Sequence, residues 1–332
     1  MGSFRSFGEQ TLHYFNRPHE GVPVGPVVHP AAWRGAGMAA RTDWVVSLDD
    51  DARGELDAAL SHARASGRKL VELSREDFPL PTLGAAVLRW REALRDGSGV
   101  VLLRGLPVER WGEEDASIFF WCLGLHLGVP GSQNAANDLL GHVRDTGEDR
   151  DDPMVRLYRT AADIRFHCDA ADVVGLLCLR AAEQGGVSRI ASSVTIFNEI
   201  LKREPDLAAR LFSEVALDVR SEGKGASSAW LPVRPCCFAD GTLRTFYHGD
   251  YYRSAQRHAD VISLGVEGQR LLDLYEEIGS EAEVRLDMDL QPGDVQLISN
   301  HFVVHSRTAY RDPPGRAGRH LLRLWLSLPP SS

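Results

Sequence analysis

The segment His167-Cys168-Asp169 places an imidazole and a carboxylate two residues apart in a stretch with the composition of a strand. Alternate residues of a strand point to the same face, so both groups can reach one metal ion while Cys168 points away. Near the C-terminus, His301 and His305 follow a Pro-Gly-Asp turn and a strand-like run. Either histidine can complete a set of two imidazoles and one carboxylate. This set leaves coordination positions open in the non-haem Fe(II) oxygenases, whereas zinc more often has a closed tetrahedral shell.

Arg319 lies fourteen residues after His305, at the start of another strand-like run. A hairpin of this length can return the arginine to the same end of a barrel, where its guanidinium can bind a carboxylate through two parallel hydrogen bonds. A metal with open positions and a guanidinium some distance away suit a dicarboxylate that chelates the metal at one end. 2-Oxoglutarate has this chemistry. The residues therefore predict an oxygenase that uses Fe(II), 2-oxoglutarate and O2.

The order of these motifs resembles that of the taurine dioxygenase-like (TauD/TfdA) family of Fe(II)/2-oxoglutarate-dependent oxygenases. The local sequences are also similar, in the stretch 166–180, in the Gly185-Gly186 pair ahead of Ala191-Ser192-Ser193, and in Gly293-Asp294 leading to His305-Ser306-Arg307. The resemblance extends over about residues 95–330. It implies a double-stranded β-helix, or jelly roll, and the iron ligands His167, Asp169 and His305 rather than His301.

The same resemblance implies roles for residues around the co-substrate. Arg319 corresponds to the arginine that binds the distal carboxylate of 2-oxoglutarate, and Ser192 lies nearest to a hydroxyl that assists it. Ser193 and Thr195 are close enough in sequence to be alternatives. Arg323 resembles a second arginine that faces the substrate in some members.

The expected reaction is oxidation, by hydroxylation, of an unactivated C–H bond of a small organic substrate, with release of succinate and CO2. Desaturation and cyclisation are alternatives, because the placement of the substrate decides the outcome. Arg323, Arg234 and Arg253 favour an anionic or zwitterionic substrate. Two other classes use similar residues: a zinc-dependent hydrolase with the same three ligands, and a jelly-roll binding protein without catalytic activity.

The hydrophobic pattern predicts a mainly β fold with helical additions (α+β) and a jelly-roll core in a single catalytic domain, residues 1–332. An N-terminal arm and helices occupy 1–95, the core occupies 96–332, and an irregular, lid-like segment covers about 128–165. Helices are expected at Ala52–Ala65, Leu83–Leu94, Glu113–Leu127, Thr195–Lys202, Pro205–Leu217 and Glu267–Ile278. The expected strands are Val100–Leu103, Val173–Leu179, Arg189–Ser192, Leu243–Tyr247, Val295–Ser299 and Leu321–Leu326.

Composition limits the partners. The 332 residues carry a net charge of -9, which argues against nucleic acid, and contain no apolar run long enough to span a membrane. Five cysteines without a C-x-x-C pair are typical of reduced thiols in a cytoplasmic protein. An acidic enzyme of this size is often a homo-oligomer. Eight other histidines, among them His142 and His320, have no partner at metal-binding spacing in the sequence.

Overall fold

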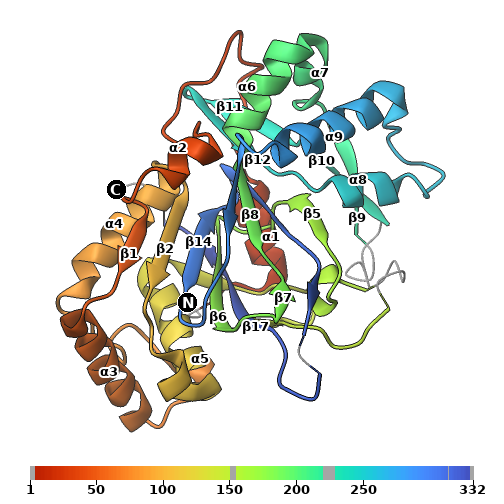
Figure 1. Ribbon diagram of the computed structural model, residues 1–332. Helices are drawn as coiled ribbons and strands as arrows, with labels where there is room; N and C mark the ends of the chain where they lie inside the picture. Colours follow the sequence, from red (N-terminus) through yellow and green to blue (C-terminus); the bar gives the residue numbers. More distant parts are fainter. Residues whose placement is uncertain (1–3, 150–154, 220–228, 313, 330–332) are drawn as a thin grey trace.

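Two antiparallel sheets face each other in the computed structural model, which describes residues 4–149, 155–219, 229–312 and 314–329. The larger sheet has the order β1-β2-β14-β6-β17-β3, with β4 also paired to β17, and the smaller has the order β13-β8-β15-β5. Only β1 and β2 pair in parallel among these strands. The arrangement is the predicted jelly roll with helices added outside it (Figure 1).

The strands of the larger sheet are β1 (Val45–Ser47), β2 (Val100–Arg104), β3 (Val129–Gly131), β4 (Leu140–Val143), β6 (Val173–Arg180), β14 (Val295–Ser299) and β17 (His320–Ser327). Those of the smaller sheet are β5 (Ile164–His167), β8 (Ser188–Ser192), β13 (Arg285–Met288) and β15 (Val303–Arg307). Three two-stranded ribbons complete the described strands: β7 (Gln184–Gly185) with β16 (Tyr310–Arg311), β9 (Val215–Asp218) with β10 (Trp230–Val233), and β11 (Cys236–Ala239) with β12 (Thr242–Thr245).

The helices are α1 (Phe7–Phe15), α2 (Gly35–Ala39), α3 (Asp50–Ala65), α4 (Leu83–Arg95), α5 (Val108–Leu127), α6 (Ser193–Arg203), α7 (Pro205–Arg210), α8 (Gly249–Ala255) and α9 (Gly265–Ser280), with short 3-10 helices at Leu70–Glu72 and Leu157–Arg159. Helices α3, α4 and α5 lie on one flank of the larger sheet, and α6, α7 and α9 gather at the other end of the molecule (Figure 1). None of the helices in the described ranges is long and apolar enough to cross a membrane.

Alternation along β17 divides the core into two parts. Leu322, Leu324 and Leu326 pack outward with α5, whereas Leu321 and Trp325 point into the space between the sheets. Strand alternation places Arg319 and Arg323 on this inner face as well. Both arginines are buried, so the interior of the jelly roll contains charged groups that need partners.

The N-terminal segment differs from the expected arm over the surface. Residues Phe7–Phe15 form α1, whose first turn has a capping box between Ser6 and Glu9. Gln10 and Tyr14 of this helix are completely buried. The apolar periodicity is weak over so short a helix, and its docking against the core could not be read from it. The expected irregular segment 128–165 includes β3, β4 and β5, and its residues 150–154 lie outside the described residues.

Candidate active site

The structure brings His167, Asp169 and His305 together between the two sheets. His167 ends β5 and is the register partner of His305 on β15, and Asp169 follows two residues later. The Nε2 atom of His167 lies 4.0 Å from Oδ1 of Asp169, and Nε2 of His305 lies 3.9 Å from Oδ2. The three donor atoms lie within 4.8 Å of one another, a spacing that one metal ion can bridge.

Electrostatics keep His305 and Asp169 in the protonation states that bind metals. Burial lowers the pKa of His305 to about 3, with a further contribution from the neighbouring His167, so its imidazole is neutral at neutral pH. Burial alone would raise the pKa of Asp169, but the charge of Arg323 and the two histidines hold it well below its usual range. The Nδ1 atom of His167 is 2.9 Å from the carbonyl of Arg165, so Nδ1–H donates there and Nε2 keeps its lone pair for the site.

Strand β17 orients the carboxylate. The indole N–H of Trp325 donates to Oδ2 of Asp169 at 2.9 Å, and Nη1 of Arg323 lies 3.4 Å from the same oxygen. The Nε–H of Arg323 donates to Oε1 of Gln133 at 2.7 Å. Arg323, which the sequence interpretation placed among the co-substrate residues, therefore contacts the carboxylate of the candidate metal centre in this structure.

His301 lies elsewhere. Its Nε2 is 2.9 Å from Oδ1 of Asp172, and its ring stacks on Tyr14 with centroids 4.8 Å apart. Asp172 also binds His13 at 2.8 Å through its other oxygen. The structure thus gives His301 a packing role beside α1 and leaves His305 as the histidine adjacent to His167.

A pair of buried arginines lies beside the three metal-binding candidates. Arg307 follows His305 by two residues on β15 and shares its face, and Arg319 donates to the carbonyl of Gly186 at 3.3 Å. Their Cζ atoms lie 4.8 Å and 5.2 Å from the ring centroid of Tyr310. Burial and the nearby Arg319 lower the pKa of Arg307 to about 10. Nη2 of Arg307 donates to the carbonyls of Thr160, at 2.8 Å, and Ala162, and neither guanidinium has a carboxylate partner within the described part of the chain.

Several polar atoms around this pair are buried without a hydrogen-bond partner among the described residues. They are Nε and Nη1 of Arg307, Nη1 of Arg319, Oη of Tyr310 and Nε2 of Gln296. Unsatisfied buried donors cost free energy, and charged donors cost most. An anion with several acceptor oxygens would satisfy them. Sequence reasoning missed Arg307, although its position two residues after His305 on a strand was a usable signal.

The predicted hydroxyl is not at this place. The Oγ of Ser192 accepts from the backbone N–H of Thr195 at 3.0 Å as the N-cap of α6, and donates to the carbonyl of Ala31. The hydroxyl of Thr195 donates to the carbonyl of Trp33. Ser193 is buried at the start of α6. The hydroxyl of Ser193 is buried without a hydrogen-bond partner among the described residues. Because β8 ends at Ser192, the hydroxyls of Ser192 and Thr195 bind backbone groups around the start of the helix.

Ser188 is the serine that lies beside the arginine pair. It is the register partner of Arg307, so both side chains point to the same face of the smaller sheet. Its hydroxyl donates to Oε1 of Gln296 across the two sheets at 2.6 Å. Gly186, two residues earlier, has φ of 71°, and a Cβ there would lie 2.8 Å from Nε of Arg319. Glycine at this position thus permits the close approach of the guanidinium.

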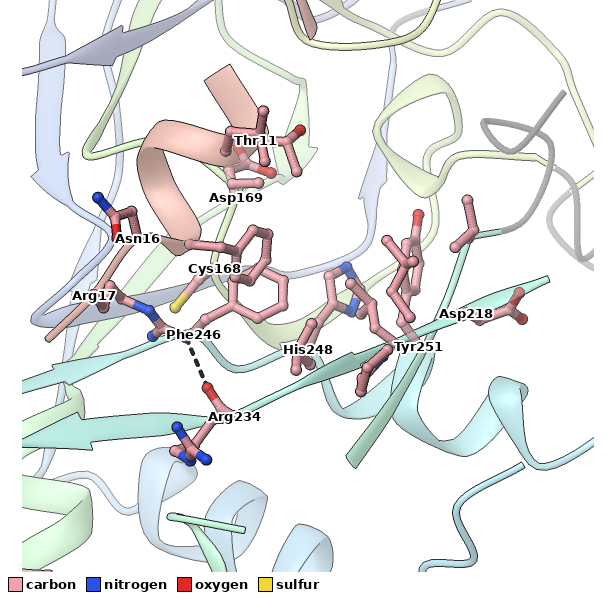
Figure 2. A pocket seen from close by; sticks show the side chains of 18 of the residues that line it. Thr11, Asn16, Arg17, Cys168, Asp169, Asp218, Arg234, Phe246, His248 and Tyr251 are labelled. Carbon is pink, nitrogen blue, oxygen red and sulfur yellow. Dashed lines mark hydrogen bonds between the residues drawn. The ribbon is translucent and has the colours of Figure 1, made fainter. Parts of the chain in front are cut away.

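A cavity of about 800 Å³ opens beside Asp169 (Figure 2). Helix α1 supplies part of its wall, and Phe246 and Tyr251 supply aromatic surface. His248 stacks on Tyr251 with centroids 3.8 Å apart, and its ring lies 5.1 Å from that of His167. Charged lining residues of both signs are Arg17, Arg156, Arg234, Glu214 and Asp218. Arg253, which the sequence interpretation considered for substrate binding, instead pairs with Asp273 at 2.6 Å.

Two histidines and an aspartate on a jelly roll, with a pair of buried arginines nearby, are the arrangement expected of the non-haem Fe(II) oxygenases that use 2-oxoglutarate. Comparison with known proteins agrees. The family model of the taurine catabolism dioxygenase TauD, TfdA family matches residues 66–325. The chain belongs to this family and is an Fe(II)- and 2-oxoglutarate-dependent dioxygenase, as the sequence predicted.

Characterised relatives cover nearly the whole chain. FR-33289 synthase of Streptomyces rubellomurinus is 31% identical over 315 residues, which span 91% of each chain. Taurine hydroxylase-like protein SAT17 of Stachybotrys chartarum is 28% identical over 91% of this chain and 80% of its own. Among solved structures, asparagine oxygenase with Fe(II), hydroxyasparagine and succinate superposes with a TM-score of 0.68 at 16% identity, covering 86% of this chain and 93% of that one. This likeness confirms the fold.

Proposed function

We propose that this dioxygenase hydroxylates a C–H bond of a small anionic or zwitterionic molecule in the cavity beside Asp169, and that His167, Asp169 and His305 hold the iron. The donor set fits Fe(II), because two imidazoles and one ionised carboxylate converge from the end of β5 and from β15. Bound iron, with 2-oxoglutarate and O2, supplies the oxidising power and releases succinate and CO2. The protein residues supply orientation and a pocket that excludes water.

The arginine pair, which has no carboxylate partner among the described residues and keeps buried donor atoms without a hydrogen bond, is the observation that carries the proposal. Arg319 and Arg307 bind the distal carboxylate of 2-oxoglutarate, with the hydroxyl of Tyr310 and the amide of Gln296 as further donors. Each of these groups has a buried polar atom without a partner among the described residues, so a carboxylate satisfies several donors at once. Two residues of strand separate Arg307 from His305 by only about 7 Å, which is compatible with one small molecule touching both regions.

Substrate charge is inferred from the wall of the cavity. Arg17 and Arg234 approach one end of it, and Glu214 and Asp218 lie on the β9–β10 side. Nε and Nη1 of Arg17 are buried without a hydrogen-bond partner among the described residues, so this guanidinium favours a molecule with an anionic group, because leaving a buried charge without a partner is costly. Aromatic faces between these groups suit an apolar middle. The five cysteines are free and buried, which supports a reducing, cytoplasmic location, and a homo-oligomer is the expected assembly.

The experiment is a succinate-release assay with Fe(II) and 2-oxoglutarate. The panel follows the names of the relatives: L-asparagine, L-arginine, taurine and uridine-5'-phosphate. All four compounds carry charged groups, and a compound that is a substrate should raise succinate release above the rate without substrate. Mass spectrometry of its product distinguishes addition of an oxygen atom from desaturation or ring closure. Asp169→Ala is the matched control.

A second measurement tests the iron and co-substrate sites without a substrate. Anaerobic addition of Fe(II) and 2-oxoglutarate should give a weak visible charge-transfer band that is absent from Asp169→Ala. Tight zinc binding without this band, and without succinate formation in the absence of substrate, would contradict the proposed site.

A further inference from the structure

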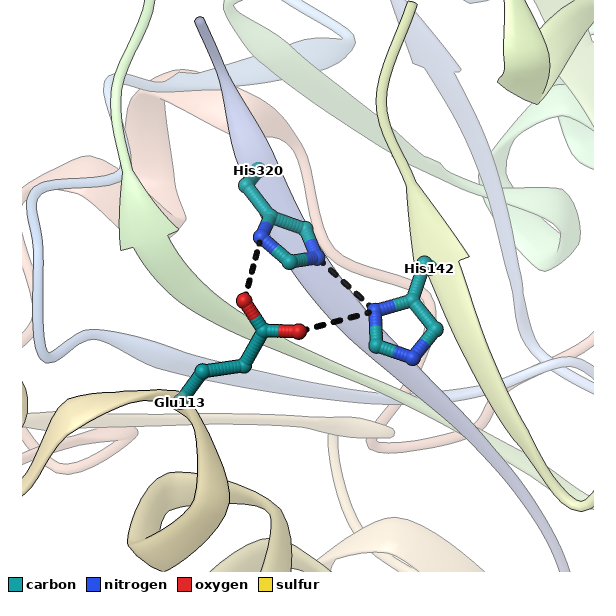
Figure 3. A group of neighbouring side chains, drawn as sticks. All are labelled: Glu113, His142 and His320. Carbon is teal, nitrogen blue, oxygen red and sulfur yellow. Dashed lines mark hydrogen bonds and ion pairs between the residues drawn. The ribbon is translucent and has the colours of Figure 1, made fainter. Parts of the chain in front are cut away.

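A second group of metal-binding side chains lies outside the active site. Glu113 of α5, His142 of β4 and His320 of β17 converge on the outer face of the larger sheet (Figure 3). His320 precedes the inward row of Leu321 and Arg323 by one residue, so strand alternation directs it away from the active site. His142 and His320 have no partner at metal-binding spacing in the sequence, because 178 residues separate two side chains that the sheet makes neighbours.

The three side chains surround a small space. Nδ1 of His142 lies 2.9 Å from Nε2 of His320. The two oxygens of Glu113 lie 3.8 Å from Nδ1 of His142 and 3.6 Å from Nδ1 of His320. One donor atom from each residue lies within 4.8 Å of the others, as in the iron-binding group. His320 is completely buried, whereas the side chains of His142 and Glu113 are 39% and 49% exposed, so ions can enter from solvent.

The geometry points to a second divalent-metal site, formed by Glu113, His142 and His320, that takes zinc or a similar borderline-soft ion. Two imidazole nitrogens and one carboxylate oxygen are a common zinc ligand set, and water can occupy the fourth tetrahedral position on the exposed side. Burial, His142 and Arg180 lower the pKa of His320 to about 4 against the opposing effect of Glu113, so its imidazole is neutral at neutral pH.

Arg180 decides which nitrogen of His320 carries the hydrogen. Its Nη2 lies 3.1 Å from Nδ1 of His320 and can only donate, so Nε2 of His320 carries the hydrogen shared with His142. An ion bound between the rings takes the place of this hydrogen. The remaining proton of His320 would then lie on Nδ1, on the side of the Glu113 carboxylate, which can also contribute an oxygen to the ion. Arg180 would turn away from Nδ1 toward the carbonyl of Gly318, which its Nε already contacts. Arg180 therefore competes with the metal.

Selectivity follows from what surrounds each site. At the inner site, 2-oxoglutarate adds two donors that help to hold Fe(II). The outer site has three protein donors and an adjacent guanidinium, so it depends on the intrinsic order of affinities, in which Zn²⁺ exceeds Fe²⁺. A bound ion would join α5 to β4 and β17, and would stabilise the folded chain by mass action.

Calorimetric titration of the full-length chain with ZnCl2 tests the site. Wild type should bind two equivalents of zinc, and Asp169→Ala, which disables the inner site, should keep one. Adding His142→Ala or Glu113→Gln to Asp169→Ala should abolish the remaining binding; both side chains are partly exposed, so these variants should fold, which circular dichroism checks. Arg180→Gln in the Asp169→Ala background should tighten binding about tenfold, the scale of outer-shell effects on metal affinity.

His126→Ala is the matched control, since the polar partner of this half-buried histidine of α5 within the described chain is the carbonyl of Phe78, at 2.7 Å. It should leave zinc binding unchanged. Failure of Asp169→Ala to bind zinc, or binding that survives both His142→Ala and Glu113→Gln, would overturn the outer site. These results are independent of the proposed function, because the inner site is disabled throughout, and a Co(II) absorption spectrum of the same variants gives a second readout of tetrahedral coordination.

Discussion

The indole N–H of Trp325 donates to Oδ2 of Asp169 at 2.9 Å, and so connects the larger sheet to a candidate iron ligand beside the smaller one. Arg323, two residues earlier on β17, approaches the same oxygen at 3.4 Å. Together they fix the plane of the carboxylate. Partners of this kind orient metal ligands, and their removal typically lowers metal affinity or activity by about 10–100-fold.

Trp325→Phe should therefore lower the affinity for Fe(II) by about tenfold, because the aromatic packing remains while one hydrogen bond to Asp169 is lost. Anaerobic titration with Fe(II) measures it. Trp121→Phe is a suitable control, since the indole N–H of Trp121 is buried without a hydrogen-bond partner among the described residues. Equal iron affinity in both variants would mean that Trp325 does not orient the carboxylate.

The two C-terminal histidines should respond differently to substitution. His305→Ala should abolish iron binding, because it removes one of three protein donors. His301→Ala should keep iron binding but destabilise the fold by about 1–3 kcal/mol, because Asp172 loses a buried hydrogen-bond partner. Iron titration and urea unfolding of both variants separate these effects. Iron loss in His301→Ala with binding retained in His305→Ala would reverse the assignment.

The arginine pair should control the affinity for 2-oxoglutarate. Arg319→Gln should weaken its binding about 100-fold, as expected for loss of a charge-assisted pair worth about 1.5–3 kcal/mol, and Arg307→Gln about tenfold. Anaerobic titration of the Fe(II)-loaded enzyme, followed by the charge-transfer band, measures both. Arg189→Gln is the control, because Arg189 of β8 pairs with Asp287 away from this group. An unchanged affinity in Arg307→Gln would limit the site to one arginine.

Glu276 of α9 should make stability depend on pH. Burial, with a contribution from Asp250, raises the pKa of its carboxyl to about 7 in the folded chain, against 4.5 for the ordinary group. The folded state favours the protonated form of the Glu276 carboxyl. Its contribution to the free energy of unfolding is therefore fully present below pH 4.5 and is lost as the pH rises through 7. Wild type should thus lose about 1–3 kcal/mol between pH 5 and 8 relative to Glu276→Gln.

Urea unfolding at the two pH values measures this difference. Glu277→Gln is the matched control, because the carboxylate of Glu277, the next residue in the helix, is exposed and pairs with Arg270. It should retain the wild-type pH dependence. Parallel changes in all three proteins would show that Glu276 is not the group responsible.

Sequence alone predicted much of this fold because its signals are local. The continuous apolar run Val100–Leu103 and the mostly apolar run Val295–Ser299 have strand length, and the helical spacing of Ala52–Ala65 is regular. The metal-binding candidates were accessible for the same reason: Asp169 follows His167, the last residue of a strand, by two residues, and a turn signal leads toward His305.

Other features depend on contacts between distant segments. The pair His142 and His320 forms only when β4 joins the edge of β17, and α1 is fixed by Tyr14 and Asp172 of the core rather than by its own short pattern. The absence of a carboxylate partner for Arg307 among the described residues becomes apparent only in the folded structure, where Arg319 lies beside it. No local spacing encodes these relationships.

Ser192 illustrates the limit within a single motif, and its replacement gives the last prediction. Its hydroxyl caps α6, so Ser192→Ala should cost about 1 kcal/mol of unfolding free energy and leave the affinity for 2-oxoglutarate within twofold of wild type. Ser188→Ala should have the opposite profile. Loss of the bond to Gln296 frees the amide that faces the arginine pair, and 2-oxoglutarate binding should weaken about 3–10-fold, the scale of one hydrogen bond. Anaerobic titration and urea unfolding of the two variants give a crossed pattern, because one serine stabilises a helix and the other holds a donor for the co-substrate. Weakened co-substrate binding in Ser192→Ala, with normal binding in Ser188→Ala, would return the assisting hydroxyl to the position that the family resemblance implied.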